Sequence, residues 1–363
     1  MAIILITGAR APIALELSRS FHKAGHIVIM ADSMHLTIAR WSNTVKKYYL
    51  LPSPRYELPQ YIERLNEIIE KEQVEHLIPT CEEAYYMSMG KEQLKAKVWT
   101  SAMDLINRLH NKYLFSQFTK EDLPIPKTCT LTDFSDWENA ENYVFKPIYS
   151  RFATSVIIGK KLSATYFSPQ EKTHWIAQKR IKGKEICVYS IWDNGKLKAY
   201  AAYHPLYRAG KGSGIFFEPV FHSPTYKLVQ DFGAKMDYTG QLCFDVIIDE
   251  TNTPYFIECN PRGTSGAHLI HSHLAQAFLG EKEILFHEKQ TFSIKYALFI
   301  LHFFSFFREE IRHSQDVIFQ WKDKKPFFFQ ILSLFEITFV KFRKNVSWLE
   351  ATTGDIEWNG EHQ

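Results

Sequence analysis

Cysteine is scarce in this sequence, and the few cysteines lie far apart. The 363 residues contain five cysteines, and no two of them form a CxxC pair. An odd, scattered set argues against a disulfide framework and against a structural zinc site. We therefore expect a protein of the reducing cytoplasm.

Long hydrophobic runs are also missing. The longest apolar stretch, residues 296–307, is interrupted by His302 and Ser305. A membrane-spanning helix needs about 20 predominantly apolar residues, so we expect no transmembrane segment. The chain starts without a basic leader and leads directly into the strand-like residues 3–7, which is not the pattern of a signal peptide.

An excess of one charge is absent as well. The 43 Lys and Arg residues are nearly balanced by 40 Asp and Glu residues, for a net charge of +3. This is too small for the basic field of a nucleic-acid-binding protein. The hydrophobic fraction of 45% is that of a folded globular protein, and the length suggests about two or three domains.

The first part of the chain, residues 1–110, alternates between strand and helix patterns. Such alternation predicts a parallel sheet with right-handed crossovers, and therefore a Rossmann-like α/β domain. Strand patterns occur at residues 3–7, 26–31 and 76–79, and helical patterns at residues 13–23 and 58–72.

Successive hairpin signals predict a different architecture for residues 111–285. The sequence Asp193-Asn194-Gly195 between two apolar runs is a strong hairpin signal. We expect an α+β unit with antiparallel sheets, divided into a small lobe at about 120–180 and a large lobe at about 181–285.

Residues 286–363 are rich in phenylalanine. Of the 28 phenylalanines, 13 lie between Phe292 and Phe342. We expect a helical C-terminal region whose aromatic faces pack on the body of the protein. The alternative is that its apolar face, with lysines nearby, binds a second copy, another partner chain or a membrane surface.

Two strands joined by a polar turn carry the most informative side chains. Glu258 and Asn260 point to the same face of the second strand, and the first strand can bring Asp245 beside them. Such hard oxygen donors, followed by Arg262, suit Mg²⁺ (or Mn²⁺) bridging phosphate oxygens. Upstream, Lys146 ends an apolar strand, where an ammonium group fits beside phosphates.

Taken in order, these segments resemble the ATP-grasp superfamily, especially its carbamoyl-phosphate-synthase-like and biotin-carboxylase-like members, over roughly residues 1–280. The motifs are the helix at Asn111-Lys112, the strand at residues 145–147, the segment 178–185 and the sequence Glu258-Cys259-Asn260-Pro261-Arg262. The resemblance implies an α/β domain followed by a two-lobed α+β ATP-grasp domain, with ATP and Mg²⁺ as cofactors.

The resemblance also implies roles for individual residues. Asp245, Glu258 and Asn260 would hold the metal, and Arg262 would stabilise the transferred phosphoryl group or bind the carboxylate substrate. The nucleotide contacts it implies are Lys112 and Lys146 at the phosphates, Gln178, Lys179 and Ile181 in the adenine pocket, and Glu185 near the ribose.

Two loops qualify this prediction. The loop at residues 148–155 has no glycine, although the family usually has a glycine-rich loop there, so hydroxyl groups and Arg151 would have to serve as phosphate donors. A second loop, residues 203–214, is basic and rich in glycine, and could close over an anionic substrate through Arg208 and Lys211.

The function that follows is an ATP-dependent ligase that joins a small-molecule carboxylate and an amine through an acyl phosphate, with bicarbonate as an alternative acceptor. A second hypothesis is an ATP-binding scaffold without turnover. A third is a nicotinamide-dependent oxidoreductase, since Gly8 follows a strand and Asp32 ends the next one. The dinucleotide-binding pattern has three glycines, however, and this sequence has a glycine at one of those positions, Gly8.

Overall fold

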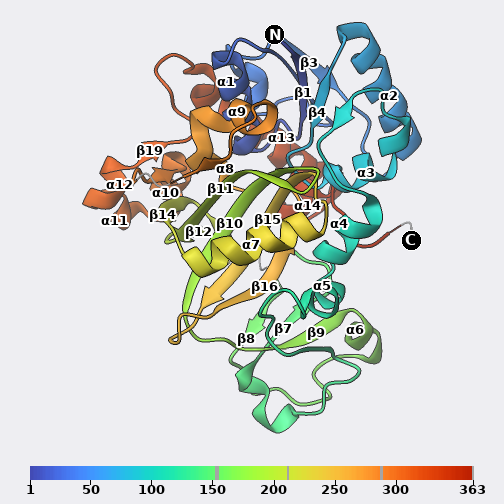
Figure 1. Ribbon diagram of the computed structural model, residues 1–363, viewed down its shortest axis with the longest axis vertical. Helices are drawn as coiled ribbons and strands as arrows, with labels where there is room; N and C mark the ends of the chain where they lie inside the picture. Colours follow the sequence, from blue (N-terminus) through green and yellow to red (C-terminus); the bar gives the residue numbers. More distant parts are fainter. Residues whose placement is uncertain (152–154, 211, 287–288, 362–363) are drawn as a thin grey trace.

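The computed structural model describes residues 1–151, 155–210, 212–286 and 289–361. Its N-terminal part is a parallel sheet with strand order β3-β2-β1-β4-β5, drawn in blue and cyan in Figure 1. This confirms the predicted parallel α/β architecture. The strands are β1 (Ile3–Thr7), β2 (Ile27–Asp32), β3 (Lys47–Leu50), β4 (His76–Ile78) and β5 (Lys97–Val98).

Helices cover both faces of this sheet, which explains why β1 is apolar at nearly every position. Ile4 and Ile6 pack in one cluster with α1 (Pro12–Lys23), whereas Leu5 packs in another with α2 (Leu58–Glu72). A strand buried on both faces reads as a continuous hydrophobic run. The connections to the next part are α3 (Glu83–Met89), α4 (Met103–His110) and α5 (Lys112–Thr119).

A small antiparallel sheet, with strand order β6-β9-β7-β8, forms the lower end of the molecule in Figure 1. Its own aromatic core includes Phe134, Phe145 and Phe167. Its elements are β6 (Thr128–Thr130), β7 (Tyr143–Pro147), β8 (Ile157–Ile158), α6 (Pro169–Thr173) and β9 (Trp175–Lys179).

A larger sheet lies between these two parts. Its order in the described residues is β16-β15-β10-β11-β14-β18-β19, with β17 beside β11. The predicted hairpin joins β10 to β11, and both Asn194 and Gly195 have positive φ (46° and 69°), as a tight type I′ turn requires. The main strands are β10 (Lys184–Asp193), β11 (Lys196–Pro205), β14 (Phe216–Val220), β15 (Gly240–Ile248) and β16 (Pro254–Asn260).

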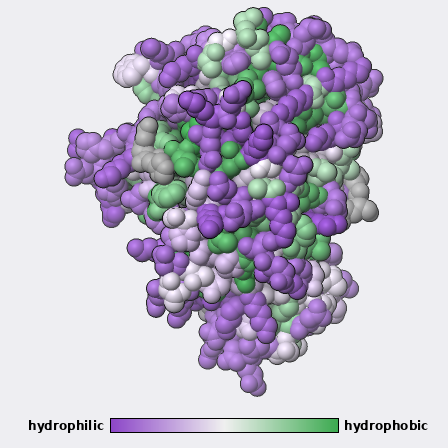
Figure 2. Space-filling view, in the orientation of Figure 1, coloured by the Kyte–Doolittle hydropathy of each residue, from purple (hydrophilic) through white to green (hydrophobic). Residues whose placement is uncertain are grey.

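The two faces of the large sheet are covered differently. Helix α7 (Ser223–Lys235) packs on one face through Val229 and Phe232. The other face shares a core with α1, α8 (Ala267–Ile270) and α9 (Leu274–Leu279), so the large sheet and the N-terminal part are joined by a common core. The surface in Figure 2 is largely hydrophilic, with separate smaller apolar areas.

The C-terminal region contains helices, but it also extends the large sheet. Short strands β18 (Phe292–Ser293) and β19 (Gln315–Asp316) pair there, and β17 (Ile284–Leu285), just before this region, pairs with β11. Among the described residues, no helix is both long and apolar enough to cross a membrane. The helices are α10 (Lys295–Leu301), α11 (Phe303–Phe306), α12 (Glu309–His313), α13 (Lys325–Lys344) and α14 (Trp348–Thr353).

The expectation that the aromatic faces of this region pack on the body is right for one part and wrong for another. Phe327 packs against the main core, and Phe329 stacks on Trp41. Phe335 and Phe342, in contrast, are 68% and 72% exposed. The spacing of the aromatic residues predicts that they share one side of a helix, but it does not tell whether that side faces the protein or the solvent.

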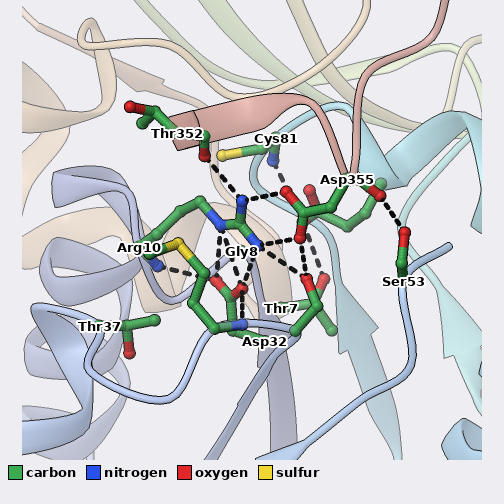
Figure 3. A network of polar contacts seen from close by, with 12 residues as sticks. Thr7, Gly8, Arg10, Asp32, Thr37, Ser53, Cys81, Thr352 and Asp355 are labelled. Atoms are coloured by element: carbon green, nitrogen blue, oxygen red, sulfur yellow. Dashed lines mark hydrogen bonds and ion pairs between the residues drawn. The ribbon is translucent and has the colours of Figure 1, made fainter. Parts of the chain in front are cut away.

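After α14 the chain returns to the carboxyl ends of the N-terminal strands. Figure 3 shows the Arg10 guanidinium between Asp32 (2.5 Å) and Asp355 (2.6 Å). Further along, Trp358 is fully buried and its indole N–H donates to Asn107 (3.1 Å). The final segment therefore fastens the two ends of the chain together.

Candidate active site

Acidic side chains form a row across three strands of the large sheet. In the antiparallel register, Asp245 on β15 lies opposite Glu258 on β16 and opposite Cys187 on β10. Directly opposed residues share a face, and Glu185, two positions before Cys187, points to the same side. The pairing of Asp245 with Glu258 is the one that the hairpin predicted.

Two buried lysines lie next to this row. The Lys112 ammonium is 3.5 Å from a Glu258 carboxylate oxygen and donates to the Ser150 carbonyl (3.0 Å). The Lys146 ammonium donates to the Ile257 carbonyl (2.9 Å). Burial lowers the pKa of Lys146 to about 8, against the opposing attraction of Glu258. Both ammonium groups are therefore held in fixed positions, and the nearby carboxylates do not fully offset the cost of burying the positive charge of Lys146.

The two central carboxylates have different environments. Burial, followed by repulsion from Glu258 and Glu185, raises the pKa of Asp245 to about 7. Burial also acts to raise the pKa of Glu258, but Lys112 and Lys146 outweigh it, and the pKa of Glu258 is lowered. A bound cation next to Asp245 would offset the repulsion between its carboxylate and those of Glu258 and Glu185.

The donor set in this row fits a divalent cation. Ligand atoms of Glu185, Cys187 and Asp245 lie within 4.8 Å of one another. The amide of Asn260 donates to Glu258 (3.4 Å), so these two predicted ligands are also adjacent. Carboxylate and amide oxygens suit magnesium or manganese, whereas the thiol of Cys187 does not.

A cavity of about 500 Å³ lies between the small sheet and the acidic row. This volume is within the usual range for small-molecule sites, about 300–1,000 Å³. Lys112 lies behind Glu258 and is not in its lining, and Lys211 lies outside the described residues. The other predicted residues all line it: Lys146, Gln178, Lys179, Ile181, Glu185, Arg208, Asp245, Glu258, Asn260 and Arg262.

The side chains from β9 and β10 have protein partners at the far side of the cavity. The Gln178 amide donates to the Thr128 hydroxyl (3.1 Å), and the Lys179 ammonium lies 4.8 Å from the centre of the Tyr143 ring. Glu185 forms an ion pair with Arg208 (2.6 Å). Arg208 is therefore positioned by Glu185, and the pair closes this side of the cavity.

Arg262 is held at the opposite side by the N-terminal part. Its Nε is 3.7 Å from a Glu82 carboxylate oxygen, and this buried Nε–H has no hydrogen-bond partner among the described residues. Buried donors are rarely left unpaired. This Nε–H faces Glu82 and is itself inaccessible, whereas the Arg262 residue lines the cavity, where its positive charge favours an anionic ligand.

Two features of the site were not evident from the sequence. Cys187 lies in the acidic row, and its spacing from Glu185 was the signal that could have found it. Arg151, expected as a phosphate donor, forms ion pairs with Glu82 (2.9 Å) and with Glu357 of the C-terminal segment. Thr154, another expected donor, lies outside the described residues.

The crevice proposed for a nicotinamide nucleotide is closed. Asp32, which would bind the ribose, is paired with Arg10, and Ile356 lines the space next to Gly8. The remaining volume is about 10 Å³, which is the size of one water position. The N-terminal sheet therefore offers no room for a dinucleotide in this conformation.

The fold and the cavity together define the class of protein: an α/β protein with an acidic and cationic cavity between two antiparallel sheets. Residues 109–266 match the family model described as an ATP-grasp domain. This part of the chain is an ATP-grasp domain, as the resemblance implied.

Solved structures with the same fold are distant in sequence. N5-carboxyaminoimidazole synthetase from Staphylococcus aureus is 13% identical, with a TM-score of 0.62 over 89% of this chain and 91% of that one. L-amino acid ligase from Bacillus licheniformis is 14% identical, with a TM-score of 0.56 over 80% and 78%.

The biotin carboxylase domain of 2-oxoglutarate carboxylase from Hydrogenobacter thermophilus, solved with MgADP, ADP and bicarbonate, is 14% identical, with a TM-score of 0.58 over 77% and 70%. At these identities the likeness concerns the fold. No curated protein matches the chain in sequence.

Proposed function

We propose that the protein is an ATP-dependent ligase that forms an amide bond between a carboxylate and an amine. A carboxylate oxygen attacks the γ-phosphorus of ATP, which gives an acyl phosphate and ADP. The amine then attacks the acyl carbon, the bond to phosphate breaks, and the amine nitrogen loses a proton. Released products are ADP, phosphate and the amide.

The observation that carries this proposal is the alignment of Asp245 and Glu258 at one cavity, with Lys146 in its wall and Lys112 behind Glu258. Phosphoryl transfer depends on positioning and on neutralising negative charge, without a covalent intermediate on the enzyme. Lys112 and Lys146 supply fixed positive charge, and Arg262, which lines the cavity, would bind the transferred phosphoryl group or the substrate carboxylate.

The proposed cofactors are ATP and Mg²⁺ (or Mn²⁺). Asp245, Glu258 and Asn260 would hold the ion, and its charge would offset that of the phosphates. Gln178, Lys179 and Ile181 would line the adenine pocket and Glu185 would approach the ribose. The bound MgADP named for the Hydrogenobacter structure supports this assignment.

We further propose that the chain is divided into three parts, as expected from the resemblance to ATP-grasp ligases: a Rossmann-like domain at 1–110, the ATP-grasp domain at 111–285 and a C-terminal region at 286–363. Its small-molecule substrates would enter near Arg208 and Arg262. The five free cysteines support a cytoplasmic location.

Coupled release of ADP and phosphate tests the ligase proposal. The purified protein is incubated with ATP, magnesium and pooled carboxylates, with and without pooled amines, and adducts are identified by mass. Release that depends on a carboxylate, with an adduct when an amine is present, supports the proposal. Release that depends on bicarbonate alone would assign a carboxylation instead. No release with any pool would contradict both.

The second candidate is an ATP-binding protein without turnover. Two observations favour it: the loop at residues 148–155 lacks glycine, and Arg151 is paired with Glu82 and Glu357 instead of facing a ligand alone. Saturable ATP binding by calorimetry together with no ADP release would establish this candidate. Hydride exchange with a nicotinamide nucleotide would support the oxidoreductase hypothesis, which the closed crevice next to Gly8 argues against.

A further inference from the structure

Helix α13 (Lys325–Lys344) has the reverse of the usual polarity for a helix at a protein surface. Such a helix normally turns its apolar stripe inward and its polar residues outward. In α13 the buried positions are Pro326, Gln330 and Ser333. Most of its large hydrophobic residues are exposed, although Phe327 packs against the main core and Phe329 stacks on Trp41.

Besides these aromatic contacts, polar contacts attach the inward face of α13 to the body of the protein. Glu336 accepts hydrogen bonds from the backbone N–H groups of His35 (2.9 Å) and Leu36 (2.6 Å), and the Ser333 hydroxyl donates to the Leu36 carbonyl. These contacts fix which side of the helix faces the N-terminal part. The orientation is therefore specific, because rotating the helix would leave a carboxylate without its donors.

The outward face is a continuous apolar stripe. Its members follow one another at spacings of three or four residues, which places them on one side of the helix. Large apolar side chains left exposed in this way mark an interaction surface. The stripe comprises Phe328, Ile331, Phe335, Phe339 and Phe342, all of them exposed.

Positive charge flanks the stripe at both ends. The cations are Lys322, Lys324 and Lys325 before the first turn and Lys341, Arg343 and Lys344 in the last turns. Residues 321–348, all of which the structure describes, contain two acidic residues, and both are used inside the protein. Asp323 pairs with Arg19 (2.9 Å), and Glu336 caps the backbone as described.

This charge pattern discriminates between possible occupants. If a second copy packed its α13 against this one, antiparallel or parallel, cationic ends would face cationic ends without an acid between them. A surface of negative headgroups above an apolar interior matches both the charge and the stripe. Exposed Trp321 and Trp348 lie at the two ends of the helix, where tryptophan favours the membrane–water interface.

We propose that α13 docks the protein on an anionic lipid bilayer, with the helix in the plane of the interface. The aromatic stripe enters the boundary between headgroups and acyl chains, and the lysines contact lipid phosphates. The surface is separate from the cavity, so this inference does not depend on the ligase proposal. Docking would confine the enzyme to a membrane surface while leaving its active site in water.

Vesicle sedimentation tests the docking. The full chain is mixed with vesicles of phosphatidylcholine alone, or of phosphatidylcholine and phosphatidylglycerol in equal parts. We expect sedimentation with the anionic vesicles and little with the neutral ones, and a decrease at high salt. Phe335→Ser should weaken the partitioning about tenfold. Arg343→Gln with Lys344→Gln should weaken it by about fivefold for each cation removed.

Phe304→Ser is the matched control, because Phe304 is an exposed phenylalanine of α11, outside the stripe. It should leave vesicle binding unchanged, and an equal loss would overturn the assignment to α13. Absence of binding to anionic vesicles would overturn the proposal. So would a concentration-dependent dimer that Phe335→Ser dissociates, since the stripe would then be covered by a second copy. ADP release should be the same for all variants.

Discussion

The cavity and helix α13 break the usual rule of burial in opposite directions. At the acidic row beside the cavity, Lys112 and Lys146 are only 2% and 4% exposed, whereas phenylalanines of α13 are exposed to solvent. Each arrangement costs free energy in the isolated protein. The buried ammonium groups lose their hydration, and the apolar surface of α13 is exposed to water. Such costs are typical of surfaces that a ligand completes. The comparison therefore points to two binding functions, one for a polyanion inside and one for an amphipathic surface outside.

The largest effect should come from Glu258→Gln. The change removes one charge from the acidic row at almost constant volume, so the fold should be retained. Turnover should decrease by about 100-fold or more, because the charge acts at the transferring phosphoryl group. Glu281→Gln, on an exposed residue outside the cavity, is the control and should keep full activity. A rate for Glu258→Gln equal to that of the control would remove Glu258 from the site.

Asp355→Asn should loosen the C-terminal segment that fastens Arg10. Arg10 keeps Asp32 but loses a charged partner, so the free energy of unfolding should decrease by about 2 kcal/mol in urea titrations. The matched change Asp104→Asn breaks the exposed pair with Arg108 (2.9 Å) and should cost about 0.5 kcal/mol or less. Equal effects of the two changes would contradict a structural role for this segment.

Lys146→Met should weaken ATP binding about tenfold and yet stabilise the protein without ligand. Burial lowers the pKa of Lys146 to about 8, so the unfolded chain holds this proton more tightly than the folded protein. The wild type should therefore gain stability relative to Lys146→Met as the pH rises from about 8 towards the ordinary lysine pKa.

Urea titrations across this pH range, with calorimetry for ATP, measure both effects of Lys146→Met. Lys182→Met, at an exposed position, should change neither quantity. If Lys146→Met destabilised the protein at pH 7 and left ATP affinity unchanged, Lys146 would be a structural residue.

The smallest effect should come from Phe335→Ser. Its ring is exposed, so the free energy of unfolding should change by no more than about 0.5 kcal/mol in urea titrations. Phe244→Ser, in the buried core of the large sheet, should cost several times more. A large destabilisation by Phe335→Ser would mean that α13 is packed and that the comparison with the cavity fails.

The acidic row could be predicted because local rules determine it. Strand alternation places Glu258 and Asn260 on one face, and a short polar turn pairs their strand with that of Asp245. The parallel sheet followed in the same way from alternating strand and helix patterns. These features depend on residues that are close in sequence.

Other features depend on residues that are far apart, and the sequence offered no local signal for them. Arg151 pairs with Glu357, and Arg10 pairs with Asp355, across most of the chain. Strands of two residues, such as β18, show no periodicity. The polarity of α13 is decided by backbone donors at His35 and Leu36, which no pattern within the helix reveals.

Crystals grown with ADP and manganese test the central claim most directly, since manganese can be located by its anomalous scattering. The account predicts a manganese peak between Asp245 and Glu258, with the nucleotide phosphates beside Lys146. A nucleotide bound elsewhere, or a manganese ion that avoids these two carboxylates, would contradict it.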